Sequence, residues 1–224
     1  MAKPRSSLLA LLLFCTGPAW AGAGIDDAKT VDGDGQAWIA EYALHDAQGE
    51  RRLVIACDAD EVEYRLPDTP IHVWLRGGDG LAHREVFPAE MRVVEYAPGD
   101  LRALGHTPDW AQLRGLVEPE LRARLRDAGS ARVVGGEARR YRGDENGAKV
   151  ELDWLAEAGL PAYFRSGRGD SRVELRLRRL ERKPAAQAFT ATEGYRELDY
   201  TDIGDMELDP FARRYILMGA GGHR

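Results

Sequence analysis

The residues with the clearest chemical potential lie on a predicted β-hairpin around Gly77-Gly78-Asp79-Gly80. In the register that this turn implies, Trp74 faces His83 and His72 faces Glu85, and all four share one face of the hairpin. Imidazole and carboxylate groups are ligands of zinc and copper. One hypothesis is therefore a metal-binding protein that uses His72, His83 and Glu85.

A second interpretation of this face is a polar surface without a ligand. His72 and His83 are diagonal neighbours, and the hairpin offers no third ligand beyond Glu85. Histidine-rich strand faces are also common on solvated surfaces. We therefore expect no tightly bound transition metal and no cofactor.

The sequence contains none of the short motifs that identify common enzyme sites. It has no Gly-x-Ser-x-Gly elbow, phosphate loop, His-Glu-x-x-His helix or paired-cysteine metal site. Cys57 follows the apolar run Leu53-Val54-Ile55-Ala56, which predicts a buried strand and a structural thiol. We therefore expect a protein that is not an enzyme.

The elements that position these residues are predicted to be antiparallel strands, and the clearest ones lie between residues 131 and 180. In residues 172–178, polar and apolar side chains alternate strictly. Such alternation predicts strands with one packed face and one solvated face. The inner faces would carry Val150, Leu152, Trp154, Val173, Leu175 and Leu177.

Residues 109–128 change to a helical period. Trp110, Leu113, Leu116, Leu121 and Leu125 are three to four residues apart within each of two runs, which is the spacing of one helix face. The resulting helices either close the sheet as an ordinary core or form a movable lid over a hydrophobic cavity. Both interpretations need the same apolar stripe.

Three short motifs in the strand region carry a family resemblance. Asp153-Trp154, Gly159-Leu160-Pro161 and Phe164-Arg165 resemble the periplasmic lipoprotein-carrier (LolA/LolB-like) superfamily. The resemblance covers roughly residues 36–190. It implies an α+β fold, namely a curved, incomplete antiparallel β-barrel with helices covering the open face and a hydrophobic cavity between them.

The ends of the chain have a different composition from this domain. Residues 1–21 are typical of a secretory signal peptide, with Lys3 and Arg5, an apolar run and Ala19-Trp20-Ala21 as the cleavage site. Residues 22–35 are predicted to be a flexible lead-in. We therefore expect a periplasmic protein without a transmembrane segment.

Residues 191–224 depart from the carrier pattern, because an acidic segment is followed by a short amphipathic helix. Asp209-Pro210 predicts the start of this helix, and Phe211, Tyr215 and Met218 share one face. Gly219 is predicted to end it. The helix either packs on the sheet or contacts a partner.

The favoured function is a non-enzymatic carrier or chaperone for a lipid, acyl chain or lipoprotein. An alternative is a protein-binding envelope sensor or assembly module on the same fold. The formal net charge of −6 does not favour a nucleic-acid partner. The predicted cavity residues are Trp110, Leu113, Leu116, Leu121, Leu125, Val150, Leu152, Trp154, Val173, Leu175 and Leu177.

Overall fold

A computed structural model describes residues 35–221 of the chain and the side chains up to residue 218. The predicted signal peptide and nearly all of the predicted lead-in lie outside the described residues. Within the part that the structure describes, no helix is long and apolar enough to cross a membrane.

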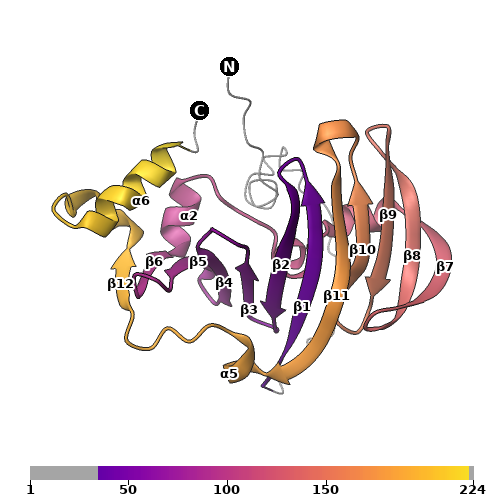
Figure 1. The fold of residues 1–224 in the computed structure, drawn as a ribbon, viewed down its shortest axis with the longest axis horizontal. Helices are drawn as coiled ribbons and strands as arrows, with labels where there is room; N and C mark the ends of the chain where they lie inside the picture. Colours follow the sequence, from indigo (N-terminus) through magenta and orange to yellow (C-terminus); the bar gives the residue numbers. More distant parts are fainter. Residues whose placement is uncertain (1–34, 222–224) are drawn as a thin grey trace.

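The fold is built on one open, curved sheet of 12 strands (Figure 1). The strand order is β12-β6-β5-β4-β3-β2-β1-β11-β10-β9-β8-β7, and every pair is antiparallel except β12 with β6. The strands are β1 (Gln36–Asp46), β2 (Gly49–Cys57), β3 (Glu61–Arg65), β4 (Ile71–Gly77), β5 (Gly80–Phe87), β6 (Arg92–Tyr96), β7 (Arg126–Val133), β8 (Gly136–Glu145), β9 (Ala148–Leu155), β10 (Leu160–Ser166), β11 (Val173–Pro184) and β12 (Arg196–Asp199).

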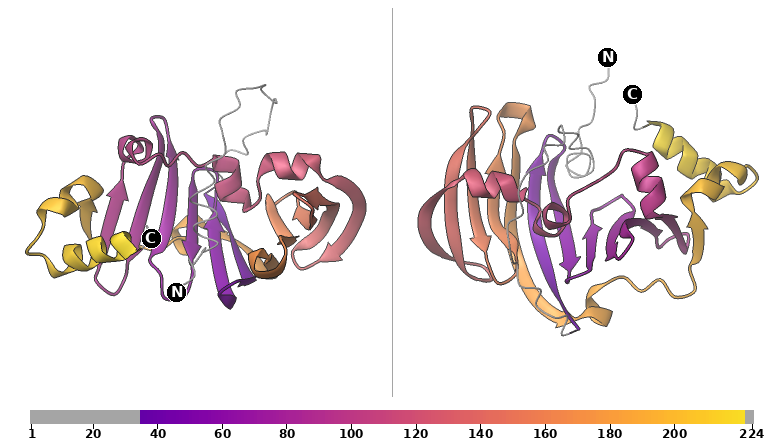
Figure 2. Two further views of the ribbon diagram at one scale, coloured as in Figure 1. Left: turned by 90° about the horizontal axis from the view of Figure 1, so that it is seen from above. Right: turned by 180° about the vertical axis from the view of Figure 1, so that it is seen from behind.

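Short helices cover the inner face of this sheet. They are α2 (Pro98–Ala103), α3 (Trp110–Gly115), α4 (Pro119–Arg124) and α6 (Pro210–Gly221), while α5 (Ala185–Ala188) lies on the outer face. The described residues also form two 3₁₀ turns, η1 (Gly169–Ser171) and η2 (Tyr200–Asp205). Figure 2 shows α4 crossing the curved part of the sheet formed by β8 to β11, with α3 next to it on the side of β1. The expected incomplete antiparallel barrel with helices over its open face is therefore confirmed.

A β-bulge contributes to the curvature at the centre of the sheet. Glu41 pairs with Arg179 and Tyr42 pairs with Leu177, so Arg178 is the extra residue in β11. A bulge bends its strand and increases the local twist. The extra residue also reverses which side chains of β11 point inward. Leu175 and Leu177 therefore face the core before the bulge, and Leu180 packs against the core after it.

The predicted helical region ends earlier than expected. Helix α4 stops at Arg124, and strand β7 begins at Arg126, whereas a helix was expected to residue 128. The physical reason is that β8 is long and its outer edge needs a hydrogen-bonding partner, which Arg126 and the residues after it supply. Leu125 stays buried, but as the residue that turns the chain from helix to strand.

The C-terminal segment returns to the first half of the sheet. After α5 the chain crosses to the far edge, where β12 pairs with β6 and α6 packs over β5 and β6 (Figure 1). Asp209 caps α6 by accepting a hydrogen bond from the backbone N–H of Phe211 at 2.8 Å. The predicted stop at Gly219 is wrong because α6 continues to Gly221; one glycine costs a helix only about 1 kcal/mol.

Candidate ligand-binding cleft

The two short helices α3 and α4 owe their position to local capping and close packing. The Asp109 carboxylate accepts a hydrogen bond from the Gln112 backbone N–H at 2.8 Å and so caps α3. Leu116, with a φ of 61°, ends α3 in a left-handed conformation. A Cβ atom at Gly115 would lie 3.1 Å from the Trp154 ring, so glycine permits α3 to approach β9 closely.

A cleft of about 290 Å³ lies between these helices and strands β10 and β11. Its apolar lining comes from both sides, namely from Leu116, Val117, Leu121, Phe164, Val173 and Leu175. Leu116, Val117 and Leu175 are buried, whereas the other three side chains are partly exposed. The cleft therefore has a buried apolar floor and accessible apolar walls.

The polar residues that complete the lining include two carboxylates and no basic side chain. They are Gln112, Glu118, Glu145, Asn146, Ser166 and Ser171, together with the backbone of Gly167. Arg124 lies outside the lining and forms an ion pair with Glu145 at 2.7 Å. The lining contains no lysine, arginine or histidine, so it offers a ligand carboxylate no cationic partner and suits an apolar chain whose polar end is uncharged.

The structure separates the predicted cavity residues into three groups. Leu116, Leu121, Val173 and Leu175 line the cleft. Leu113 and Leu177 lie in the main core with Trp110 packed beside them, and Leu125, Val150, Leu152 and Trp154 form a smaller cluster behind the cleft. Most of the predicted apolar stripe is thus ordinary core, and only part of it faces open space.

Two apolar lining residues were not among those predicted for the cavity. Phe164 pairs with Leu152 on one side and with Leu175 on the other, so it continues a row of inward-facing side chains across three strands. Its position in the cleft could have been predicted only from the pairing of β10 with both β9 and β11. Val117 precedes α4 in the connection from α3, where a helical period does not apply.

The hairpin register that the sequence predicts is confirmed, because Trp74 pairs with His83 and His72 pairs with Glu85. The polar-surface interpretation of this face is wrong. His72 and His83 are only 6% and 5% exposed. The physical reason is that this face belongs to the concave side of the sheet, and the Tyr215 hydroxyl of α6 donates a hydrogen bond to the Glu85 carboxylate at 2.5 Å.

Burial determines the protonation chemistry of this hairpin cluster, defined as His72, His83, Glu85, Tyr96 and Tyr215. Burial lowers the pKa of His72 to about 4 and lowers the pKa of His83 well below its usual range. Burial also raises the pKa of Glu85. Both imidazoles are therefore neutral near pH 7.

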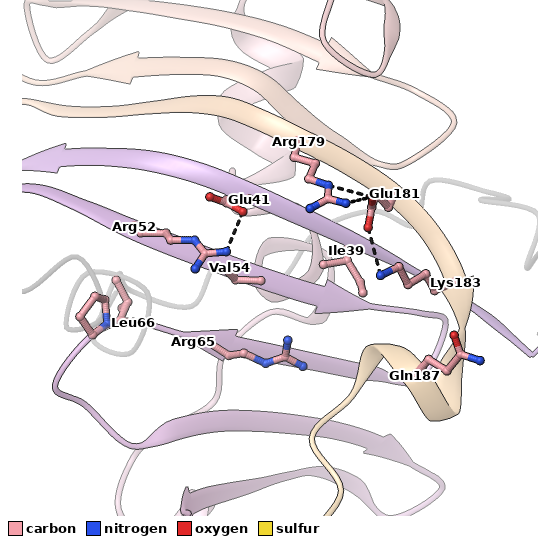
Figure 3. A pocket seen from close by; sticks show the side chains of 11 residues that line it. Ile39, Glu41, Arg52, Val54, Arg65, Leu66, Arg179, Glu181, Lys183 and Gln187 are labelled. Atoms are coloured by element: carbon pink, nitrogen blue, oxygen red, sulfur yellow. Dashed lines mark hydrogen bonds and ion pairs between the residues drawn. The ribbon is translucent and has the colours of Figure 1, made fainter.

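A larger hollow of about 550 Å³ lies on the opposite, outer face of the sheet (Figure 3). Most of its charged side chains pair with one another: Arg52 contacts Glu41 at 2.7 Å and Lys183 contacts Glu181 at 3.2 Å. Arg179 also pairs with Glu181. The hollow has the properties of a solvated, salt-bridged sheet face rather than those of a site for an apolar ligand.

Comparison with known proteins gives structural likeness only. No protein-family model and no curated protein matches the sequence. An uncharacterized conserved protein from Thermus thermophilus is similar at 15% identity with a TM-score of 0.45, over 73% of this chain and 90% of that chain.

Two further solved structures are similar to this chain. PNGF-II matches at 10% identity with a TM-score of 0.42, over 78% of this chain and 34% of that chain. MucB in the MucA/MucB complex of Pseudomonas aeruginosa matches at 16% identity with a TM-score of 0.40, over 70% of this chain and 56% of that chain. This chain thus spans about a third to just over half of those two chains, and these values do not assign it to a family.

Proposed function

We propose that this protein is an exported, non-enzymatic periplasmic carrier or chaperone that holds one acyl chain of a lipid or lipoprotein in the cleft between α3–α4 and β10–β11. The observation that supports this most is the presence of accessible apolar side chains, Leu121, Phe164 and Val173, around a buried apolar floor. Each CH₂ group that such a surface removes from water contributes about 0.8 kcal/mol. The basic and apolar composition of residues 1–21 supports export.

The size of the cleft limits the ligand. Sites for small molecules usually enclose roughly 300–1,000 Å³, and the cleft of about 290 Å³ is just below that range. One acyl chain fits this volume better than a lipid with two chains. The polar rim contains no lysine, arginine or histidine, which favours a chain attached through an uncharged ester or amide.

Extraction of the purified protein followed by mass spectrometry tests this proposal directly. We expect co-purified species with one long acyl chain in uncharged linkage. A displacement assay with a fluorescent monoacylglycerol then measures affinity, and we expect the free fatty acid of the same chain length to compete less well at pH 8. Absence of both bound lipid and probe binding would contradict the carrier function and favour the protein-binding alternative.

A further inference from the structure

Three metal-ligating atoms converge in the hairpin cluster, on the opposite half of the sheet from the cleft. The Nδ1 atom of His72 lies 3.1 Å from the Nε2 atom of His83 and 3.7 Å from the Oε1 atom of Glu85. All three atoms lie within 4.8 Å of one another. Ligand atoms of a tetrahedral zinc site, with bonds of about 2.0–2.1 Å, are about 3.3 Å apart. The His72–His83 distance of 3.1 Å is slightly shorter than this value, and the His72–Glu85 distance of 3.7 Å is slightly longer.

The donor set is the one that zinc accepts. Two imidazole nitrogens and one carboxylate oxygen suit zinc, whereas calcium and magnesium prefer oxygen ligands throughout. The two facing nitrogens of His72 and His83 share one hydrogen-bonding proton, so one of them already presents a lone pair toward the other. Transfer of that proton to the other nitrogen of the same ring frees both lone pairs for a metal ion.

Neighbouring side chains hold the three ligands in place. The Trp74 ring stacks on His83 with 4.4 Å between ring centroids. The Tyr215 hydroxyl binds the Oε2 atom of Glu85, which leaves Oε1 directed toward His72. Tyr96 hydrogen-bonds to Tyr215 and packs against His83. Such outer contacts orient ligands in metal sites and raise affinity.

We propose that His72, His83 and Glu85 form a three-ligand zinc-binding site whose fourth position is taken by water or by the Tyr215 hydroxyl. Access is from the Glu85 side, because the Glu85 side chain is 18% exposed whereas that of His72 is 7% exposed. Since Tyr215 belongs to α6, bound zinc fixes this helix against the sheet. The site is independent of the acyl-binding cleft.

The test is a titration of the chelator-treated full chain with zinc, and with cobalt as a spectroscopic probe. We expect one zinc per chain and the visible absorption of tetrahedral cobalt. Glu85→Gln removes the charged ligand but keeps an oxygen that accepts from Tyr215, and we expect it to lower zinc affinity at least tenfold. His45→Ala is the matched control, because His45 is exposed on β1 and outside the cluster, and its affinity should equal that of wild type.

Thermal melts separate a lost ligand from a lost fold. Zinc should raise the melting temperature of wild type and His45→Ala but not that of Glu85→Gln. If Glu85→Gln does not fold, the imidazole ¹⁵N resonances of His72 and His83 in wild type should shift on zinc addition and serve as the readout. Absence of stoichiometric binding by wild type, unchanged affinity in a folded Glu85→Gln, or unshifted resonances would overturn the proposal.

Discussion

The Glu63 carboxylate accepts two hydrogen bonds from Thr190, one from its backbone N–H at 2.9 Å and one from its hydroxyl at 2.7 Å. Glu63 lies on β3 and is 1% exposed, and Arg65 donates to the same carboxylate. Thr190 belongs to the connection that leaves α5 and crosses to β12 (Figure 1). This contact therefore fixes the path by which the C-terminal elements reach the first half of the sheet.

Replacement of Glu63 tests this anchor. We expect Glu63→Ala to lower the free energy of unfolding by about 2–3 kcal/mol, because Arg65 and both Thr190 donors lose a buried acceptor. Thr190→Val removes only the hydroxyl donor and should cost about 1 kcal/mol. Urea denaturation measures both changes. A Glu63→Ala protein as stable as wild type would show that the contact does not anchor the connection.

Cys57 provides a readout of global unfolding. Its side chain is completely buried, and burial raises the pKa of its thiol to about 11. Because the thiolate is the reactive form, we expect no modification of Cys57 by a thiol reagent at pH 8 in the native protein. Modification should begin only at urea concentrations that unfold the chain. Rapid labelling of Cys57 without denaturant would contradict the buried position of β2.

The pH dependence of stability should carry a contribution from Glu61. Burial, with the nearby charges of Asp58 and Glu63, raises the pKa of Glu61 from 4.5 to about 7. The folded state thus binds this proton more tightly than the unfolded state, so the contribution is complete below pH 4.5 and is lost as pH rises to 7.

Glu61→Gln removes this titration. Because Glu61 is partly exposed and solvent screens its charge, we expect the loss between pH 4.5 and 7 to be only about 1 kcal/mol, and the variant should lack it. Urea midpoints of wild type and variant across this range measure the difference. Parallel pH curves would contradict the raised pKa.

The sequence predicted those features that depend on neighbouring residues. The alternation in β11 and the Gly-rich turn after β4 predicted strands, and the turn also fixed the register of Trp74 with His83. The helix start at Asp209-Pro210 was equally local. Such signals are present in a few consecutive residues, so no tertiary information was required.

Features that depend on distant pairing were not predictable in this way. The burial of His72 and His83 results from the concave sheet and from α6, which lies more than a hundred residues later. The strand at Arg126 forms because β8 has a free edge. Which apolar residues lie in the core and which line the cleft likewise depends on how α3 and α4 pack on the sheet. The helical spacing of Leu113, Leu116 and Leu121 does not determine that packing.

The proposed carrier function predicts a difference between Leu121 and Leu113. Leu121 lines the cleft and is partly exposed, whereas Leu113 is 1% exposed and lies in the main core. Leu113→Ala should therefore cost about 2–5 kcal/mol of stability. Leu121→Ala has fewer packing partners to lose and should cost about 1 kcal/mol or less.

The most direct test is the affinity of these two variants for a fluorescent monoacylglycerol, measured with wild type under conditions in which all three proteins are folded. We expect Leu121→Ala to bind about five- to tenfold more weakly, because it loses apolar contact with the chain. Leu113→Ala should bind within about twofold of wild type despite its lower stability. Equal affinities for wild type and Leu121→Ala, or no binding by wild type, would contradict the acyl-carrier function.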